Sequence, residues 1–134
     1  MSPRSFPGKL TVSISVFKEG GGFSVKHLYH PELENIQLSS VLYALSDPIR
    51  LFLVDTILRS GEIHCSGVDV PIAKSTLSHH LKTLREAGVV RTRVQGTQRF
   101  MSIRKEDLEA RFPGLLASIL TVYVYSGEKF QVKG

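Results

Sequence analysis

Two pairs of adjacent residues combine side chains that could bind a metal ion or carry out a reaction. His64 and Cys65 are ligand types that suit zinc-like ions, and a thiol beside an imidazole could act as a nucleophile with its base. Two ligands do not complete a tetrahedral site, however, and neighbours in sequence rarely reach the geometry that a nucleophile and its base require. We therefore expect no metal site, with His64 and Cys65 as weak candidates only, and no cofactor.

The second pair, His79 and His80, falls in a segment with helical periodicity. Adjacent positions on a helix point about 100° apart, so the two imidazoles cannot readily chelate one ion. We expect His79 to face a binding partner and His80 to pack or form a hydrogen bond inside the protein.

The common motifs of enzymes are missing from the sequence. It contains no Gly-rich phosphate loop, no GxSxG turn and no HExxH motif, and its acidic residues are scattered. The single cysteine, Cys65, excludes an intrachain disulfide and is either a buried, inert thiol or a redox-active one. We expect the protein not to be an enzyme.

The basic residues gather in one region of the chain. The 134 residues carry 17 Lys and Arg against 12 Asp and Glu, a formal net charge of +5. Residues 74–105 hold eight of these basic residues and one acidic residue, Glu86, whereas the remainder is slightly acidic. Such a concentration favours a nucleic-acid partner over an ordinary solvated surface. No apolar run approaches the roughly 20 residues of a membrane span, and no signal sequence is recognisable, so we expect a cytoplasmic protein.

Apolar periodicity predicts the elements that carry this charge. Helical spacing appears at about residues 38–45, 48–60, 75–87 and 105–123, and strand alternation at 89–94 and 99–103. Gly96 suits the tip of a hairpin between the two strands. Residues 62–73 are ambiguous, because Gly67 and Pro71 leave room only for a short helix.

Capping and breaking residues predict where these helices begin and end. Asp47 suits an N-cap and Pro48 the first position of the second helix. Ser75 or Thr76 would cap the third helix, and Pro113 should kink or break the last one.

The chain divides into a central domain and two flanking segments. Residues 1–29 form an N-terminal arm, in which residues 10–17 and 23–28 could pair as a β-hairpin around Gly20–Gly22. Residues 30–125 form the domain, and residues 126–134 a polar tail.

Two segments of this domain resemble a known family. Residues 41–51 read VLYALSDPIRL and resemble the LxALSDPxRL opening of ArsR/SmtB-family bacterial repressors. Residues 75–90 read STLSHHLKTLREAGVV and are similar to the recognition-helix segment of that family, and the basic hairpin follows in the expected place. The resemblance covers roughly residues 30–123. It implies a mainly α winged helix–turn–helix fold with a β-hairpin wing, dimerising through its first and last helices.

The resemblance also implies a function and a set of contact residues. The N-terminal part of a recognition helix faces base edges, and the wing reaches the backbone or minor groove. On this basis we expect DNA contacts from Lys74, Ser75, Thr76, Ser78, His79, Lys82 and Arg85 of the helix and from Arg91, Arg93, Gln95, Thr97, Gln98 and Arg99 of the wing. The family's metal sensors carry a Cys-x-Cys-type pair or Asp and His ligands on the last helix. This chain has neither, so metal sensing by those sites is not implied.

These observations predict a sequence-specific regulator that binds double-stranded DNA. We expect a homodimeric repressor acting on an inverted-repeat operator. The sequence reveals neither the identity nor the existence of an effector. The alternative is a winged-helix module for protein–protein contact without operator binding. The Ser78-His79-His80 segment and the local positive charge speak against that alternative.

Overall fold

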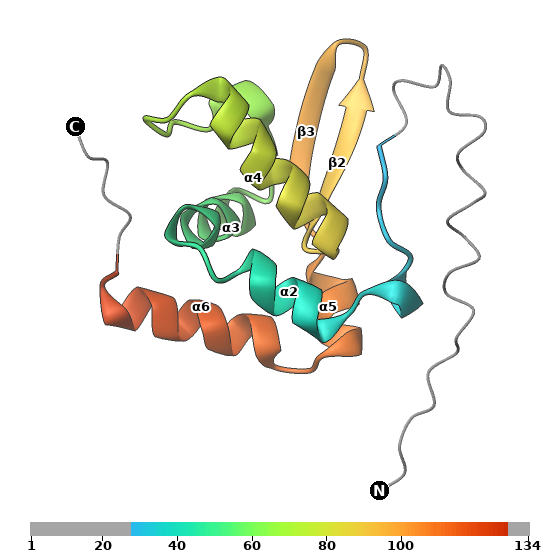
Figure 1. Cartoon of the computed structure of the whole chain (residues 1–134), viewed down its shortest axis with the longest axis vertical. Helices are drawn as coiled ribbons and strands as arrows, with labels where there is room; N and C mark the ends of the chain where they lie inside the picture. The colour runs from blue at the N-terminus through green and yellow to red at the C-terminus, as the bar shows by residue number, and fades with distance from the viewer. Residues whose placement is uncertain (1–27, 129–134) are drawn as a thin grey trace, which may run out of the picture.

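The computed structural model describes residues 28–128, a small helical domain with a three-stranded antiparallel sheet (Figure 1). The α-helices are α2 (Leu38–Ala44), α3 (Pro48–Ser60), α4 (Lys74–Ala87), α5 (Lys105–Arg111) and α6 (Leu115–Ser126); the strands are β1 (Glu62–His64), β2 (Val90–Gln95) and β3 (Gln98–Ile103); and the 3₁₀ helices are η2 (Leu33–Asn35) and η3 (Cys65–Gly67). The hairpin expected from residues 10–17 and 23–28 lies, apart from residue 28, outside the described residues, as does the tail beyond residue 128.

Helix α3 begins and ends where its sequence predicts. The carboxylate of Asp47 accepts hydrogen bonds from the backbone N–H groups of Ile49 and Arg50, at 2.8 and 3.3 Å, and Pro48 occupies the first helical position. Gly61 ends the helix with φ 86°, a conformation that is open to glycine and costly for other residues.

Helix α4 begins two or three residues earlier than a cap at Ser75 or Thr76 predicts. Its N-cap is Ala73, which has an extended backbone and makes no side-chain capping bond. The prediction that Ser75 or Thr76 caps the helix is therefore wrong. Both residues lie inside the first turn, where their hydroxyl groups are left for other partners.

The sheet contains one strand more than the predicted hairpin. Strands β2 and β3 pair from Val90↔Ile103 to Gln95↔Gln98, which leaves Gly96 and Thr97 as a two-residue turn. Strand β1 pairs with the other side of β3, giving the order β1-β3-β2. β1 is only three residues long, too short for alternation to reveal it. Residues 62–73 form β1 and η3 and contain no α-helix.

The expected break in the last helix is present. Phe112, Pro113 and Gly114 separate α5 from α6, and Gly114 adopts φ 81° as the N-cap of α6. Proline lacks the N–H that a continuous helix needs, so two helices replace one long helix.

The core lies where α3 and α4 cover the sheet. Leu53 and Ile57 of α3, Leu84 of α4, and Val90 and Met101 of the sheet are fully buried. No helix within residues 28–128 has both the length and the apolar content to cross a membrane. The core fixes α4 and the hairpin β2–β3, called the wing below, on one side of the molecule, with α6 along the opposite side (Figure 1).

Candidate nucleic-acid interface

The outer face of α4 carries exposed polar side chains. The exposed residues are Lys74, Ser75, Thr76, Ser78, His79 and Lys82. Leu81 and Leu84 are buried on the inner face of α4 and Leu77 is half-buried there, so burial orients the helix with its polar residues toward solvent. These six predicted contact residues therefore share one accessible surface.

The tip of the wing adds a second accessible group. Gln95, Thr97, Gln98 and Arg99 are all exposed around the two-residue turn. Alternation along β2 leaves Arg91 and Arg93 exposed and Thr92 and Val94 half-buried. The wing as an element lies on the same side of the molecule as α4 (Figure 1), whereas strand alternation turns Arg91 and Arg93 away from the buried face of the sheet.

Half of the basic residues in 74–105 already have acidic partners. The ion pairs are Arg85–Glu86 at 4.0 Å, Arg91–Asp107 at 3.5 Å, Arg93–Glu62 at 3.0 Å and Arg104–Asp107 at 3.0 Å. Within the described part of the chain, no acidic partner is found for Lys74, Lys82, Arg99 or Lys105, and all four are exposed. Unpaired cations can neutralise phosphates without first giving up a partner, so Lys74, Lys82 and Arg99 are the best-placed cations of the predicted interface.

Arg85 differs from the other predicted contacts on α4. Its side chain is only 13% exposed, and its Nε donates to the backbone carbonyl of Tyr29 at 3.1 Å. Burial, and secondarily the nearby Arg99, lowers the pKa of Arg85, whereas Glu86 raises it. A phosphate contact, as expected from the sequence, needs an accessible guanidinium, and Arg85 is largely buried and bonded to Tyr29. We therefore leave Arg85 out of the proposed interface.

Arg93 is held flat against the sheet. Its guanidinium donates to both carboxylate oxygens of Glu62, at 3.0 and 3.1 Å, and to Gln95 Oε1 at 2.6 Å, and it lies 4.5 Å from the centre of the Phe100 ring. The hydrogen bond from Arg93 lowers the pKa of Glu62. Because Glu62 belongs to β1 and Arg93 to β2, this pair joins the two outer strands across β3.

Arg50 is an internal residue that the sequence analysis missed. It is 5% exposed and donates to the carbonyl of Ala44 at 2.7 Å and of Tyr43 at 3.4 Å, at the end of α2. Its Nη1 lies 3.0 Å from Nδ1 of His80 on α4. A guanidinium can only donate, so Nδ1 accepts and the ring is neutral. This confirms the expectation that His80 forms an internal hydrogen bond, and it ties α4 to the start of α3.

The metal candidates His64 and Cys65 serve the local fold. Nδ1 of His64 accepts from the backbone N–H of Ser66 at 3.0 Å and lies 2.7 Å from the Ser66 hydroxyl, and the ring meets Phe100 edge-on. Cys65 is half-buried against the core. Among residues 28–128, no three His, Cys, Asp or Glu side chains gather as a metal site would need.

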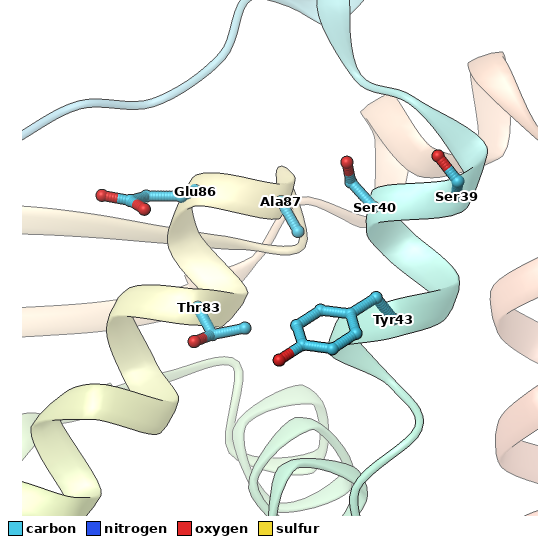
Figure 2. Close-up of a pocket in the computed structure, with 6 residues that line it drawn as sticks. All are labelled: Ser39, Ser40, Tyr43, Thr83, Glu86 and Ala87. Carbon is cyan, nitrogen blue, oxygen red and sulfur yellow. The ribbon is translucent and has the colours of Figure 1, made fainter.

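A hollow of about 390 Å³ lies between α2 and α4. Figure 2 shows Tyr43 and Thr83 facing each other across it, with the Glu86 carboxylate pointing away from them. The facing polar groups are therefore uncharged hydroxyls, which select no particular ligand.

Comparisons with known proteins agree with this arrangement. Residues 69–92 match the model of the bacterial regulatory protein, arsR family. The chain is 37% identical over 84 residues to the uncharacterized HTH-type transcriptional regulator YceK of Bacillus subtilis (strain 168), an alignment that covers 60% of this chain and 84% of YceK. It is 36% identical to the arsenical resistance operon repressor of Staphylococcus xylosus, over 54% of this chain and 71% of that repressor.

The chain belongs to the ArsR family of bacterial regulatory proteins.

Solved structures of transcriptional regulators share the fold of this one. The transcriptional repressor BigR from Xylella fastidiosa is 33% identical with a TM-score of 0.50, covering 63% of this chain and 84% of BigR. The ArsR-family transcriptional regulator RHA00566 is 26% identical with a TM-score of 0.51, covering 64% of this chain and 94% of its own. The predicted winged helix–turn–helix fold with a β-hairpin wing is thereby confirmed.

Proposed function

We propose that this ArsR-family protein is a transcriptional repressor that binds double-stranded DNA through α4 and the wing. The observation that carries the proposal is a set of exposed polar groups and of cations without an acidic partner among residues 28–128, which these two elements present on one side of the molecule. Two relatives that are named repressors, from Staphylococcus xylosus and Xylella fastidiosa, support it.

In this proposal different residues of α4 and the wing contact different parts of the DNA. Ser75, Thr76, Ser78 and His79 lie in the first turns of α4, which is where helix–turn–helix proteins contact base edges. Lys82 and Arg99 contact phosphates, which set affinity but carry no sequence information. Gln95, Thr97 and Gln98 at the wing tip reach the backbone or the minor groove beside the major groove that holds α4.

A homodimer on an inverted repeat completes the proposal. Helix α2 leaves Leu38, Leu42 and Tyr43 exposed, and α6 leaves Val122 and Tyr125 exposed, Tyr125 to 85%. Apolar side chains repeated along two helices are typical of a surface covered by a second copy. Two copies related by a two-fold axis would place two α4 helices on the half-sites of a palindromic operator.

The proposal is tested by titrating the purified protein into fluorescent duplexes. One duplex carries the region upstream of the protein's own gene, and the other a scrambled sequence of equal length and composition. We expect tighter binding to the first duplex by at least about a thousandfold, and an affinity that falls steeply between about 50 and 200 mM salt. Equal binding to both duplexes, or none, would contradict operator recognition and favour a protein–protein module.

A further inference from the structure

Three consecutive residues near the start of the described chain are each bound to a different element. The carbonyl of Tyr29 accepts from Arg85 Nε of α4 at 3.1 Å. Nε2 of His30 accepts from the backbone N–H of Thr92 in β2 at 3.0 Å. The carbonyl of Pro31 accepts from Arg104 Nη1, between β3 and α5, at 2.8 Å. The segment therefore runs beside β2 (Figure 1) and connects the recognition helix to the wing.

The bond between His30 and Thr92 needs a neutral imidazole. Nδ1 of His30 lies 3.1 Å from the carbonyl of Leu28, which can only accept, so Nδ1 carries the proton. Nε2 is then the acceptor for the Thr92 N–H. A second proton on the ring would place Nε2–H against Thr92 N–H, two donors facing each other, and the bond would be lost.

The charges around His30 also disfavour its protonation. The charged groups that face the ring are Arg85 of α4, Arg91 of β2 and Arg104 after β3, all of them cationic. Burial first, and then these three guanidiniums, lower the pKa of His30 below its usual 6.5, although the Leu28 carbonyl acts in the opposite direction. A depressed histidine pKa means that the neutral, bound form contributes its stability above the ordinary value of 6.5. That contribution is lost as the pH falls below 6.5 toward the lowered pKa.

We propose that residues 28–31 form a strap that positions α4 relative to the wing, and that His30 holds the strap only while its ring is neutral. The inference rests on the proposed function, because Lys82 of α4 and Arg99 of the wing have to reach phosphates of the same duplex together. A strap bound to both elements keeps them at the spacing that this contact requires.

The strap itself is tested without DNA, on the full chain. The amide signal of Thr92 is followed by NMR between about pH 8 and pH 5 in the wild type, His30→Gln and His30→Ala. Glutamine places an amide oxygen where Nε2 accepts and does not titrate, so it is the matched control. We expect the Thr92 amide signal to titrate in the wild type and not in His30→Gln. We also expect the amide hydrogen of Thr92 to exchange with solvent faster in His30→Ala than in the wild type at neutral pH. The same titration in wild type and His30→Gln, or none in the wild type, would overturn the strap.

The positioning role is tested by DNA affinity over the same pH range. Positive charge that a protein gains in acid strengthens its binding to DNA in general. We expect the wild type instead to lose about fivefold relative to His30→Gln at the acid end, the equivalent of one hydrogen bond. Identical pH profiles for the two proteins would overturn the positioning role. Absence of DNA binding at every pH would overturn the proposed function, while the Thr92 titration would still decide the strap.

Discussion

At the scale of single residues, Arg50 shows that helical periodicity can predict the burial of a side chain but not its partners. Arg50 stands at the same spacing as Leu53, Val54 and Ile57 on α3, and all four are buried. A charged residue in register with an apolar face therefore signals an internal arginine, and this signal was present in the sequence. The partners of Arg50 could not be predicted from the sequence, because only the tertiary fold brings Ala44 and His80 to it.

Replacing Arg50 should destabilise the protein substantially. Arg50→Met removes donors from the buried carbonyl of Ala44 and from His80 Nδ1, and hydrogen bonds to charged groups contribute about 1.5–3 kcal/mol each. We expect the free energy of unfolding, measured by urea denaturation, to fall by about 3 kcal/mol.

The matched control for Arg50 is Arg59→Met on the same helix. Arg59 is exposed and pairs with Asp55 one turn away, an arrangement worth about 0.3–0.5 kcal/mol. Equal losses for the two variants would show that the buried bonds of Arg50 contribute nothing to stability.

The two wing arginines should differ in their effect on DNA binding. Arg93 is engaged by Glu62 and Phe100, whereas Arg99 has no acidic partner among residues 28–128. Arg99→Ala should therefore weaken binding to a promoter duplex about tenfold, which is the effect of one lost phosphate contact. Arg93→Ala should weaken binding clearly less. Fluorescence anisotropy measures both affinities. A larger loss for Arg93→Ala would mean that its ion pair opens on DNA.

At the scale of elements, local signals predicted the ends of most helices. Asp47 and Pro48 start α3, and the break at Pro113 separates α5 from α6, as the sequence indicates. The cap of α4 was predicted wrongly because Ala73 begins the helix with no side-chain bond at all. Strand β1 could not be found, since its three residues are defined by pairing with β3.

The end of α4 provides a prediction at this scale. Gly88 adopts φ 93°, and a Cβ at this position would lie 2.8 Å from Cγ1 of Ile36, which is fully buried. Gly88→Ala should combine backbone strain of about 1–2 kcal/mol with a packing clash of about 1–3 kcal/mol, and thermal denaturation should report the loss.

Gly96→Ala at the wing tip is the matched control for Gly88. Gly96 also has a positive φ, 67°, but a Cβ at this position would meet no atom within 4 Å, so only the backbone strain of about 1–2 kcal/mol applies. If Gly88→Ala were no more harmful than Gly96→Ala, the contact with Ile36 would not determine how α4 packs.

At the scale of the whole molecule, the structure shows which few basic residues of the positively charged region are left without an acidic partner among residues 28–128. The excess positive charge of the chain lies in residues 74–105, with eight basic residues against one acidic residue, as the sequence shows. Which of these cations are free could not be predicted, because Glu62 and Arg93 are 31 positions apart in sequence. The exposed residues of α4 were predictable, because helical periodicity alone separates them from Leu81 and Leu84.

The exposed apolar residues of α2 and α6 lead us to expect a dimer that forms through these two helices. Leu42 is 44% exposed on α2, and Leu42→Glu would place a charge in the surface where we propose that a second copy docks. We expect sedimentation velocity to show a dimer for the wild type and a shift toward monomer for the variant. Leu33→Glu, on η2 and similarly exposed at 37%, is the control. Equal behaviour of the two variants would contradict dimerisation through α2.

The most direct measurement of the central claim is the salt dependence of DNA affinity in three proteins. Lys82 lies on the exposed face of α4, and Arg59 lies on α3 outside the proposed interface. We predict that the logarithm of affinity falls linearly with the logarithm of salt concentration for the wild type. Lys82→Ala should make the slope shallower by about 0.9, the value for one phosphate contact, and Arg59→Ala should leave it unchanged. A slope that Lys82→Ala does not alter, or that Arg59→Ala alters equally, would contradict DNA binding through this face.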